Sequence, residues 1–346
     1  MGVAALSGGD TARMQSATFA ALDLGTNNCR LLVGAATRDG FRVVDSYSRI
    51  VRLGEGLHQT GELAEAAMDR AMVALRACAD RMGRRELRAV RAVATEACRR
   101  ATNGAAFLTR VRAETGLDVK AISTREEAEL ALESCSALLA GDGRRALLFD
   151  IGGGSTELAW VRLTPGGTPS LIGYVSLPVG VVTLSDRWGQ MVFNPDGFES
   201  MVEDVMGRLE EFEQTYCISH EIRQGGVQFL GTSGTVTTLA GIALKLPRYR
   251  RPLVDGMLLA HDAALAALYN LRDLGRAGLA AHPCVGPERV DFVLPGCAIF
   301  EAIRRLWPAE DIIVADRGLR EGMLLRMIRD MGGLSSHRGH RYPYHA

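Results

Sequence analysis

Two segments that share one pattern constrain the fold of this chain more than any other feature of its sequence. Residues 21–31 and 148–158 align without gaps, and each carries an apolar stretch, an Asp-x-Gly step, a short polar turn and a second apolar stretch. Asp150 lies 127 residues after Asp23, a separation of the size of a typical domain. The simplest explanation is a chain of two related halves, each opening with a strand, a tight turn and a returning strand.

Elsewhere, short apolar runs alternate with longer helical patterns, which is typical of the α/β class. Between Gly197 and Tyr216, for example, Val202, Val205 and Leu209 recur at three- and four-residue spacing and predict a buried helical stripe. The predicted strands are 19–24, 30–35, 42–51, 87–94, 146–151, 157–163, 227–231 and 311–314. The predicted helices are 63–82, 105–114, 125–139, 197–216, 235–244, 262–271, 296–306 and 318–331.

The best candidate for a hinge between the halves is the segment 141–145, which is rich in glycine and charged residues. This hinge places a first domain at 17–140 and a second domain at 141–316. The two ends of the chain, 1–16 and 335–346, lack periodicity and are predicted to be disordered tails.

Composition excludes several classes of function. Basic and acidic side chains number 40 each, so no net charge would hold the chain on nucleic acid or on an anionic membrane. No apolar stretch reaches the roughly 18 residues that a membrane span needs.

The seven cysteines are widely spaced without a Cys-x-x-Cys pair, and we interpret them as buried free thiols of a cytoplasmic protein. The only lysines, Lys120 and Lys245, do not follow the glycine pattern of a P-loop, which excludes that phosphate site.

The turn of each Asp-x-Gly hairpin has the composition of an anion site. Glycine and small polar residues leave successive backbone N–H groups open to a phosphate group. The aspartate that ends the preceding strand places a carboxylate beside those groups, where a divalent cation can bridge it to the phosphate. A single Asp-x-Gly is more often an ordinary turn, but the duplication predicts that both hairpins grip one phosphate chain.

A third polar turn at 231–235 follows the apolar run 227–230 and precedes a predicted helix. Its N–H groups would lie at the N-terminus of that helix, where they would form another anion site. Simple capping of the helix by Thr232 or Ser233 explains the same residues equally well. Both interpretations stay open at the level of sequence.

Carboxylates near the second hairpin are the catalytic candidates. Glu157 lies on the returning strand, seven residues after Asp150, so both side chains can reach the mouth of one turn. Glu126 has the spacing of a capping box with Ser123, which leaves Glu127 free for chemistry. By spacing alone, however, a glutamate at the start of a helix is more often structural.

Several arginines are candidates for binding the anion. Arg30 lies beside the first hairpin, and Arg99 and Arg100 follow the predicted strand 87–94. A third group consists of Arg248, Arg250 and Arg251. The planar guanidinium group suits this role because it binds a phosphate through two hydrogen bonds.

Seven segments in order along the chain resemble the exopolyphosphatase and guanosine pentaphosphate phosphohydrolase family, a branch of the actin-like ATPase superfamily. These segments are 22–33, 94–99, 122–128, 150–158, 176–180, 231–235 and 316–322. The resemblance implies two ribonuclease-H-like α/β domains with a cleft between them. It also implies that a last helix, 317–331, returns to the first domain.

The same resemblance implies hydrolysis of the terminal phosphate of inorganic polyphosphate or guanosine pentaphosphate, with Mg²⁺ or Mn²⁺ as cofactor. By motif position, Glu127 resembles the family's catalytic carboxylate and Glu157 resembles its partner. Asp23, Asp150 and Glu157 would hold the metal. The phosphate-binding residues would be Gly25, Thr26, Asn27, Asn28, Arg30, Arg99, Gly152, Gly153, Gly154, Ser155, Thr156, Gly231, Thr232, Ser233 and Gly234.

The sequence departs from the family pattern close to these residues. Thr26-Asn27-Asn28 replaces the usual Ser-Asn-Ser/Thr, so the hydroxyl group at the third position is lost. Glu96 stands where a small or neutral residue is common, which would add negative charge near a polyanion.

Two other functions fit the same motifs. An ATP-dependent sugar or acid kinase on this fold would need an acceptor pocket and usually an aspartate base after the second hairpin, where this chain has glutamate. A weakly catalytic sensor of guanosine penta- and tetraphosphate would bind without releasing phosphate. We expect neither nucleic acid nor a membrane as a partner; the apolar surface of the last helices would suit a homodimer, as any core helix would.

Overall fold

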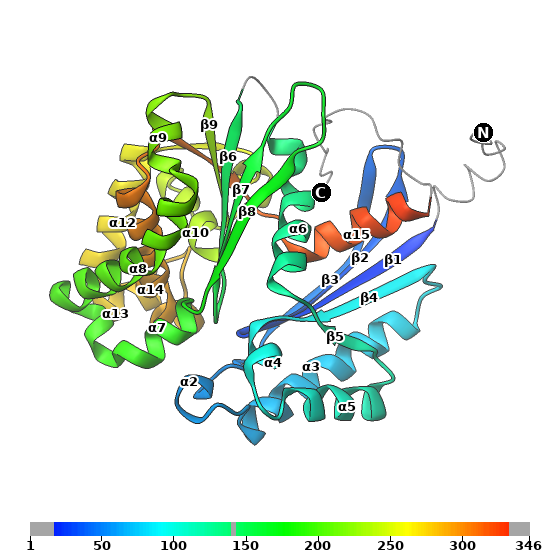
Figure 1. Cartoon of the computed structure of the whole chain (residues 1–346). Helices are drawn as coiled ribbons and strands as arrows, with labels where there is room; N and C mark the ends of the chain where they lie inside the picture. The colour runs from blue at the N-terminus through cyan, green and yellow to red at the C-terminus, as the bar shows by residue number, and fades with distance from the viewer. Residues whose placement is uncertain (1–16, 140–142, 332–346) are drawn as a thin grey trace.

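The computed structural model describes residues 17–139 and 143–331, which form two mixed β-sheets with helices packed on their faces (Figure 1). This arrangement confirms the predicted α/β class. The predicted tails 1–16 and 335–346 lie outside the described residues, as does the beginning of the predicted hinge at 141–145.

The first sheet has the strand order β3-β2-β1-β4-β5. Its strands are β1 (Thr18–Leu24), β2 (Asn28–Thr37), β3 (Gly40–Ile50), β4 (Ala89–Ala94) and β5 (Val119–Ala121). β1 and β2 are antiparallel and form the first predicted hairpin, in which Asp23 pairs with Arg30. β1, β4 and β5 are parallel, so their carboxyl ends meet at one edge of the sheet.

The second sheet repeats the order of the first. Its strands are β6 (Arg145–Ile151), β7 (Thr156–Arg162), β8 (Ser170–Leu177), β9 (Val227–Thr232), β10 (Leu258–Ala260) and β11 (Asp311–Ala315). The order β8-β7-β6-β9-β11 matches β3-β2-β1-β4-β5 strand for strand, and β10 is added antiparallel beyond β11. The structure therefore repeats the strand–turn–strand unit that the sequence repeats.

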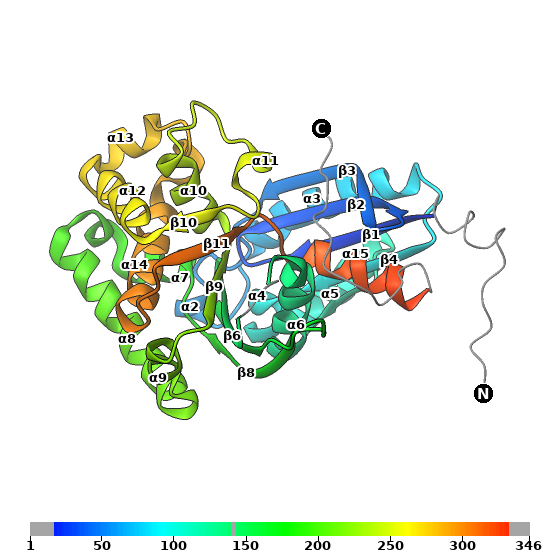
Figure 2. The same cartoon turned by 90° about the horizontal axis from the view of Figure 1, so that it is seen from above.

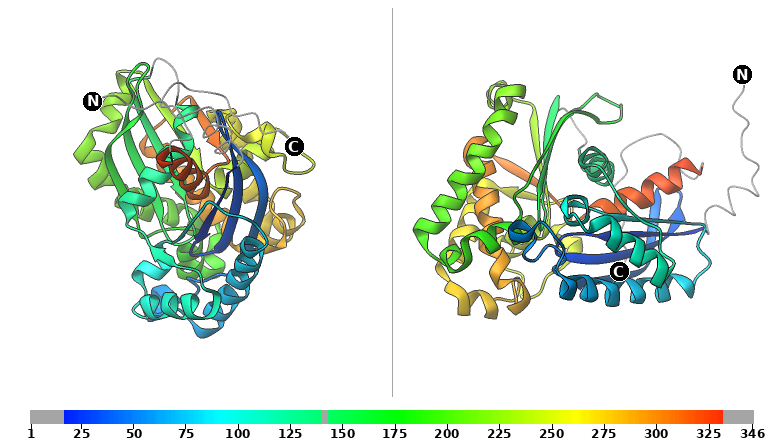
Figure 3. Two further views of the ribbon diagram at one scale, coloured as in Figure 1. Left: turned by 90° about the vertical axis from the view of Figure 1, so that its right-hand side faces the viewer. Right: turned by 60° about the horizontal axis from the view of Figure 1, so that its bottom comes forward.

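Helices cover both faces of the first sheet. α3 (Glu65–Gly83) and α5 (Gly104–Thr115) lie on one face, and α15 (Leu319–Asp330) lies on the other (Figure 1 and Figure 3). Alternate residues of β1 serve the two faces: Ala20 and Leu22 pack in the cluster under α3, whereas Phe19 and Ala21 pack against α15. The chain thus returns from β11 of the second sheet to the first sheet.

α6 (Thr124–Cys135) packs beside α15 in the space between the two sheets (Figure 1). The two helices approach closely because residue 322 is glycine; a Cβ at Gly322 would lie 2.1 Å from the carbonyl oxygen of Leu130. Leu130 joins the apolar cluster of the first sheet, and Ala131 and Leu132 join a cluster of the second sheet. This helical layer therefore determines how the sheets sit against each other.

The far face of the second sheet carries a larger group of helices (Figure 2). They include α7 (Val181–Trp188), α8 (Pro195–Tyr216), α9 (Ile218–Arg223), α10 (Gly234–Ala243), α12 (His261–Asp273), α13 (Gly275–Ala281) and α14 (Val290–Leu306). The remaining short helices are α2 (Leu57–Thr60), α4 (Glu96–Arg100) and α11 (Arg251–Val254), with 3₁₀ turns at Ser136–Leu138, Gly189–Phe193 and Pro287–Arg289.

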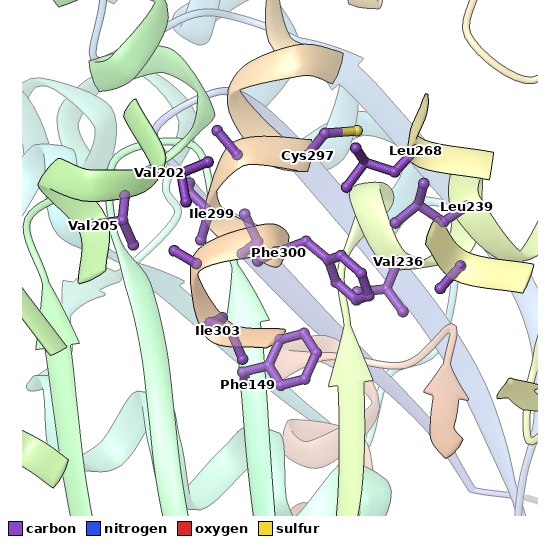
Figure 4. Close-up of a cluster of buried hydrophobic side chains, with 14 of the residues drawn as sticks. Phe149, Val202, Val205, Val236, Leu239, Leu268, Cys297, Ile299, Phe300 and Ile303 are labelled. Carbon is purple, nitrogen blue, oxygen red and sulfur yellow. The ribbon is translucent and has the colours of Figure 1, made fainter. Parts of the chain in front are cut away.

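α14 lies at the centre of this group and corrects one prediction. It begins at Val290 rather than at Gly296 and runs through Pro295, which removes a backbone donor at a typical cost of ~3 kcal/mol. Apart from Asp291, every residue from Val290 to Ile303 is buried. Figure 4 shows the ring of Phe300 within this core, beside helices and strands of the same half. Burial of the whole helix outweighs the local effect of proline.

Several other expectations were wrong in detail. The predicted helix 125–139 ends at Cys135, where a 3₁₀ turn follows. β5 and β10 were missed because three residues are too few to show a period, and β8 because it is a half-exposed edge strand. Cys217 is exposed, unlike the other six cysteines, because it caps α8 at the surface in a left-handed conformation.

Within residues 17–139 and 143–331, no helix combines the length and the apolar character that crossing a lipid bilayer requires.

Candidate functional site

The carboxyl ends of the parallel strands of both sheets surround one cavity of about 450 Å³. The turn between β1 and β2 and the turn between β6 and β7 both line it. The loops after β9 and β11 and the first turn of α6 complete the wall. Ligands of α/β proteins commonly bind outside the carboxyl ends of strands, so this cavity is the candidate site.

The two hairpin turns have the same internal geometry. The N–H of Gly25 donates to the carbonyl oxygen of Asn28 at 2.9 Å, and the N–H of Gly152 donates to that of Ser155 at 2.9 Å. A Cβ at Gly152 would lie 2.8 Å from the same Ser155 oxygen, so the second turn requires glycine there. Equivalent residues of the repeat therefore build equivalent turns on two sides of the cavity.

The tips of the two hairpins touch. A Cβ added to Gly153 would lie 3.0 Å from the Cβ of Asn27 and 3.1 Å from its backbone nitrogen. A Cβ added to Gly154 would lie 2.7 Å from the hydroxyl oxygen of Thr26. Both hairpins can approach this closely only because the second tip has no side chains.

The third predicted turn lies in the same wall. The hydroxyl oxygen of Ser233 accepts a hydrogen bond from the N–H of Thr235 at 3.2 Å, which confirms that Ser233 caps α10. Ser233 has a φ of 127°, which is uncommon for a residue with a side chain. Ser233 and Gly234 also line the cavity, so capping and a position at the candidate anion site occur together.

Five carboxyl groups line the cavity, those of Asp23, Glu127, Asp150, Glu157 and Asp316. Asp316 already accepts a hydrogen bond from the hydroxyl group of Tyr249 at 2.5 Å. Oε1 of Glu157 accepts hydrogen bonds from the hydroxyl groups of Ser155 at 2.5 Å and Ser176 at 2.9 Å, which hold this side chain in place. Oδ1 of Asp23 is buried and has no hydrogen-bond partner among the described residues. Hydrogen bonds from the protein therefore fix Glu157, whereas Oδ1 of Asp23 receives none from the described residues.

Burial raises the pKa of the acids on both hairpins. Burial raises the pKa of Asp150 to about 6, although Arg30 opposes the shift, and the charge of Asp23 adds to it. Burial also raises the pKa of Asp23, against the attraction of Arg30. The pKa of Glu157 is raised to about 7 by burial and by Asp150, despite the hydroxyl groups that bind it. A bound cation or proton would relieve this repulsion.

Glu127 enters the cavity from the first turn of α6. Arg99 donates to Oε2 of Glu127 at 3.1 Å and to the carbonyl oxygen of Ile122 at 2.9 Å. Burial, and next the charge of Glu157, raise the pKa of Glu127 well above its usual range, while Arg99 opposes the shift. Glu127 is thus a carboxyl group with strong proton affinity, held from behind by an arginine.

The neighbouring Glu126 has a structural role. The hydroxyl oxygen of Ser123 accepts from the N–H of Glu126 at 3.2 Å, which confirms this half of the predicted capping box. The reciprocal half does not form, because the carboxylate of Glu126 pairs with Arg91 instead.

The cavity brings together most of the predicted site residues: Asp23, Gly25, Thr26, Asn27, Asn28, Arg30, Glu127, Asp150, Gly152, Gly153, Gly154, Ser155, Glu157, Thr232, Ser233 and Gly234. Three predicted phosphate ligands are not among the lining residues. Arg99 binds a carboxylate instead. Thr156 donates to the carbonyl oxygen of Val179 at 2.7 Å in the interior. Gly231 lies against the ring of Phe149, whose Cζ would be 2.6 Å from a Cβ at 231.

Two lining arginines, Arg289 and Arg320, were missed by the sequence interpretation, as was Arg317, which pairs with Asp255 at 2.9 Å. Arg289 donates to the carbonyl oxygen of Gly234 at 2.8 Å and to the hydroxyl of Thr238 at 2.7 Å, at the start of α10. Between described residues, no ion pair joins a carboxylate to Arg289, Arg320 or Arg30. Arg320 lies in segment 316–322, which resembles the family but suggested no site residue, and Arg289 lies outside all seven segments. Of the four arginines that line the cavity, Arg30, Arg289 and Arg320 therefore face it without a carboxylate partner among the described residues and can bind an anion.

The residues present fit a divalent cation that binds together with phosphate. Their donors are carboxylate oxygens, which Mg²⁺ and Mn²⁺ prefer, and Oδ1 of Asp23 lacks any other partner. Among the residues that the structure describes, no three His, Cys, Asp or Glu side chains are grouped so that they could hold a metal by themselves. Mg²⁺ commonly uses one or two carboxylates, several waters and phosphate oxygens, so such a group is not required.

Comparisons with known proteins agree on one family. A model of the Ppx/GppA phosphatase family matches residues 32–331. A guanosine-5'-triphosphate,3'-diphosphate pyrophosphatase of Aeromonas salmonicida is 31% identical over 314 residues, which cover 90% of this chain and 60% of that protein. The chain thus spans about 60% of the length of this curated relative.

Solved structures give the same result. The Aquifex aeolicus member of the Ppx/GppA family matches with a TM-score of 0.74 and 26% identity, over 91% of this chain and 98% of the other. An exopolyphosphatase-like protein matches with a TM-score of 0.79 and 28% identity, over 92% and 99% of the two chains.

Proposed function

The chain belongs to the Ppx/GppA phosphatase family, and we propose that it hydrolyses a terminal phosphoanhydride bond and releases inorganic phosphate. The observation that carries this proposal is the convergence of both Asp-x-Gly hairpins and five carboxyl groups on one cavity. One relative is named a guanosine-5'-triphosphate,3'-diphosphate pyrophosphatase, and a structural neighbour is called exopolyphosphatase-like. We therefore propose guanosine pentaphosphate and inorganic polyphosphate as substrates, since both end in a phosphoanhydride.

The wall of the cavity would bind the phosphate chain. The backbone of the two hairpin turns supplies N–H groups next to glycines, where no side chain blocks a phosphate oxygen. Arg30, Arg289 and Arg320 would contact further oxygens through their guanidinium groups. Because phosphoryl transfer depends mainly on positioning and charge stabilisation, these groups would carry much of the catalysis.

Glu127 would orient the attacking water and accept its proton during in-line attack on the terminal phosphorus. A general base is most effective when its pKa lies near the working pH, and the raised pKa of Glu127 suits this role. Arg99 would keep the carboxylate in position. Glu157, held by two serine hydroxyl groups, would act as the second acid of the site.

Asp23, Asp150 and Glu157 would hold the divalent cation, Mg²⁺ or Mn²⁺. When bound, that cation would neutralise negative charge on the phosphate oxygens and on the buried acids.

A side-by-side assay tests the proposal. Phosphate release would be measured from short polyphosphate, long polyphosphate and guanosine pentaphosphate, with and without Mg²⁺, and without any acceptor molecule. We expect multiple turnovers with at least one substrate. Slow release from ATP that becomes rapid transfer when a sugar or acid is added would favour the ATP-dependent kinase, and tight binding without release would favour a sensor.

A further inference from the structure

Glu96 is a buried carboxylate that the proposed reaction does not use. It is the first residue of α4, and only 3% of its surface is exposed. Its Oε1 pairs with Arg100 at 2.7 Å, and its Oε2 accepts a hydrogen bond from the hydroxyl group of Thr26 at 3.1 Å. The second hairpin meets the same oxygen, since a Cβ at Gly154 would lie 2.1 Å from Oε2. Glu96 therefore lies behind the point where the two hairpin tips touch.

This hydrogen bond decides what Thr26 can offer a phosphate. A hydroxyl group has one proton to donate, and Thr26 donates it to Glu96. The backbone holds Thr26 in place: its carbonyl oxygen accepts from the N–H of Gly54 at 2.9 Å, and a Cβ at Gly54 would lie 2.2 Å from its methyl carbon. In this arrangement Thr26 lines the cavity but cannot donate to an anion, and a carboxylate lies directly behind it.

Resting on the proposed function, we infer that Glu96 is a positioning residue that lowers the affinity of the first hairpin for phosphate. Glu96 acts through Thr26, because it takes the hydroxyl proton that a phosphate oxygen would otherwise accept. Its negative charge also repels the anionic chain of the substrate. Glu96 does not touch the reacting atoms, so its effect falls on substrate binding and not on the chemical step.

The Glu96→Ala variant tests this inference with tripolyphosphate as the substrate. The substitution frees the hydroxyl proton of Thr26, and Arg100, whose side chain is 39% exposed, can turn to solvent. We expect KM to fall about tenfold while kcat stays within about twofold, because a hydrogen bond to a charged oxygen supplies roughly this factor.

The Thr26→Val variant shows whether the hydroxyl group carries the effect. Valine keeps the shape of threonine and its contact with Gly54. In the wild-type background we expect a smaller change in KM than in the Glu96→Ala background, because the hydroxyl proton is already donated to Glu96. In the Glu96→Ala background the same substitution should remove most of the gain. This difference between backgrounds measures the coupling between the two residues.

Glu129→Ala is the matched control. Glu129 forms the same kind of i,i+4 pair with Arg125, on α6, and does not line the cavity. Its removal deletes the same charge and should leave KM at the wild-type value. A KM for Glu96→Ala at or above the wild-type value would overturn the inference. A gain that survives in the Glu96→Ala/Thr26→Val double variant, or one that Glu129→Ala shows equally, would overturn it as well.

Two further measurements keep the inference separate from folding and from the proposed function. If Glu96→Ala does not fold, Thr26→Val alone decides, and a large rise in its KM would contradict the inference. If the wild-type protein releases no phosphate from any substrate, the proposed function fails. Calorimetric titration of tripolyphosphate into the same variants then tests the affinity effect without turnover, with the same tenfold gain expected.

Discussion

Asp150 pairs with Glu157 directly across the second hairpin. The equivalent positions of the first hairpin, 127 residues earlier, hold Asp23 and Arg30, which also pair directly. The strand–turn–strand unit thus occurs in two copies with different charges. The second copy places two acids on one side of the cavity, and the first copy places an acid and a base on the other side. The charge of the cavity is therefore asymmetric: the second hairpin favours a cation, and the first can favour an anion.

The buried acid pair predicts that Glu157→Gln stabilises the protein at alkaline pH. The pKa of Glu157 is raised to about 7 in the folded state. The contribution of Glu157 to the free energy of unfolding is therefore fully present below about pH 4.5, where its carboxyl group is protonated, and is lost as pH rises through about 7. Glutamine cannot ionise, so the variant does not lose this contribution at high pH. The free energy of unfolding of the variant minus that of wild type should therefore be at least about 1 kcal/mol larger at pH 8 than at pH 5. Urea unfolding without divalent cations measures this, and an equal difference at both values would contradict it.

Glu127→Gln should lower turnover by about 10²- to 10⁴-fold, the usual contribution of a general base, with a modest effect on KM. Steady-state phosphate release measures both parameters. The matched control is Glu126→Gln on the next residue of α6, whose carboxylate pairs with Arg91 and should be dispensable for turnover. Unchanged turnover in Glu127→Gln would remove Glu127 from the proposed role.

Arg99→Met distinguishes a positioning arginine from a phosphate ligand. Arg99 lowers the pKa of Glu127, so its loss should raise that pKa further. Because the base acts when deprotonated, the acidic limb of the kcat profile should move to higher pH. Arg91→Met, which affects only the pair with Glu126, should leave the limb in place. A raised KM with an unmoved limb would instead support the phosphate contact that the sequence predicted for Arg99.

Gly154→Ala should separate the hairpin tips. Its methyl group would lie 2.1 Å from Oε2 of Glu96 and 2.7 Å from the hydroxyl oxygen of Thr26. Because Glu96 is buried, we expect the second hairpin to move away from the first rather than these side chains to turn aside. Misplacement of this size typically lowers turnover by about 10²-fold. At Gly207, on the exposed side of α8, an added Cβ meets nothing within 4 Å, so Gly207→Ala should raise stability by ~0.5–1 kcal/mol and leave turnover unchanged. Normal turnover in Gly154→Ala would show that the tips need not touch.

Mg²⁺ should stabilise the folded protein through Asp23. Because Oδ1 of Asp23 is buried without a partner, a bound cation would satisfy it. At a concentration of 100 times Kd, a ligand of the folded state alone adds about 2.7 kcal/mol to the free energy of unfolding. Asp23→Asn should lose most of this gain, and a chelator should reverse it in wild type. Thermal unfolding with and without Mg²⁺ measures the effect; an equal gain in both proteins would exclude Asp23 as a ligand.

The residues missed or misplaced by sequence analysis share one property. Arg289 and Arg320 reach the cavity from segments distant from both hairpins, so no local pattern connects them to the turns. Thr156 and Gly231 stand next to predicted turns, but their strands direct them into the interior. Proximity along the chain thus predicted which segments approach the cavity. It did not predict which residues of those segments face the cavity and which face the interior.

By itself, the sequence determined the two hairpins, because the conformation of a turn depends on the few residues within it. Gly25 and Gly152 close equivalent turns for that reason. The sequence left the cap of α10 open between Thr232 and Ser233, and the structure shows that Ser233 is the cap. Only the tertiary structure decided that the two tips touch, that Glu127 and Glu157 line one cavity, and that Arg99 turns to a carboxylate. These contacts join segments far apart along the chain, and they depend on how α6 and α15 pack between the two sheets. No spacing within either hairpin encodes that packing.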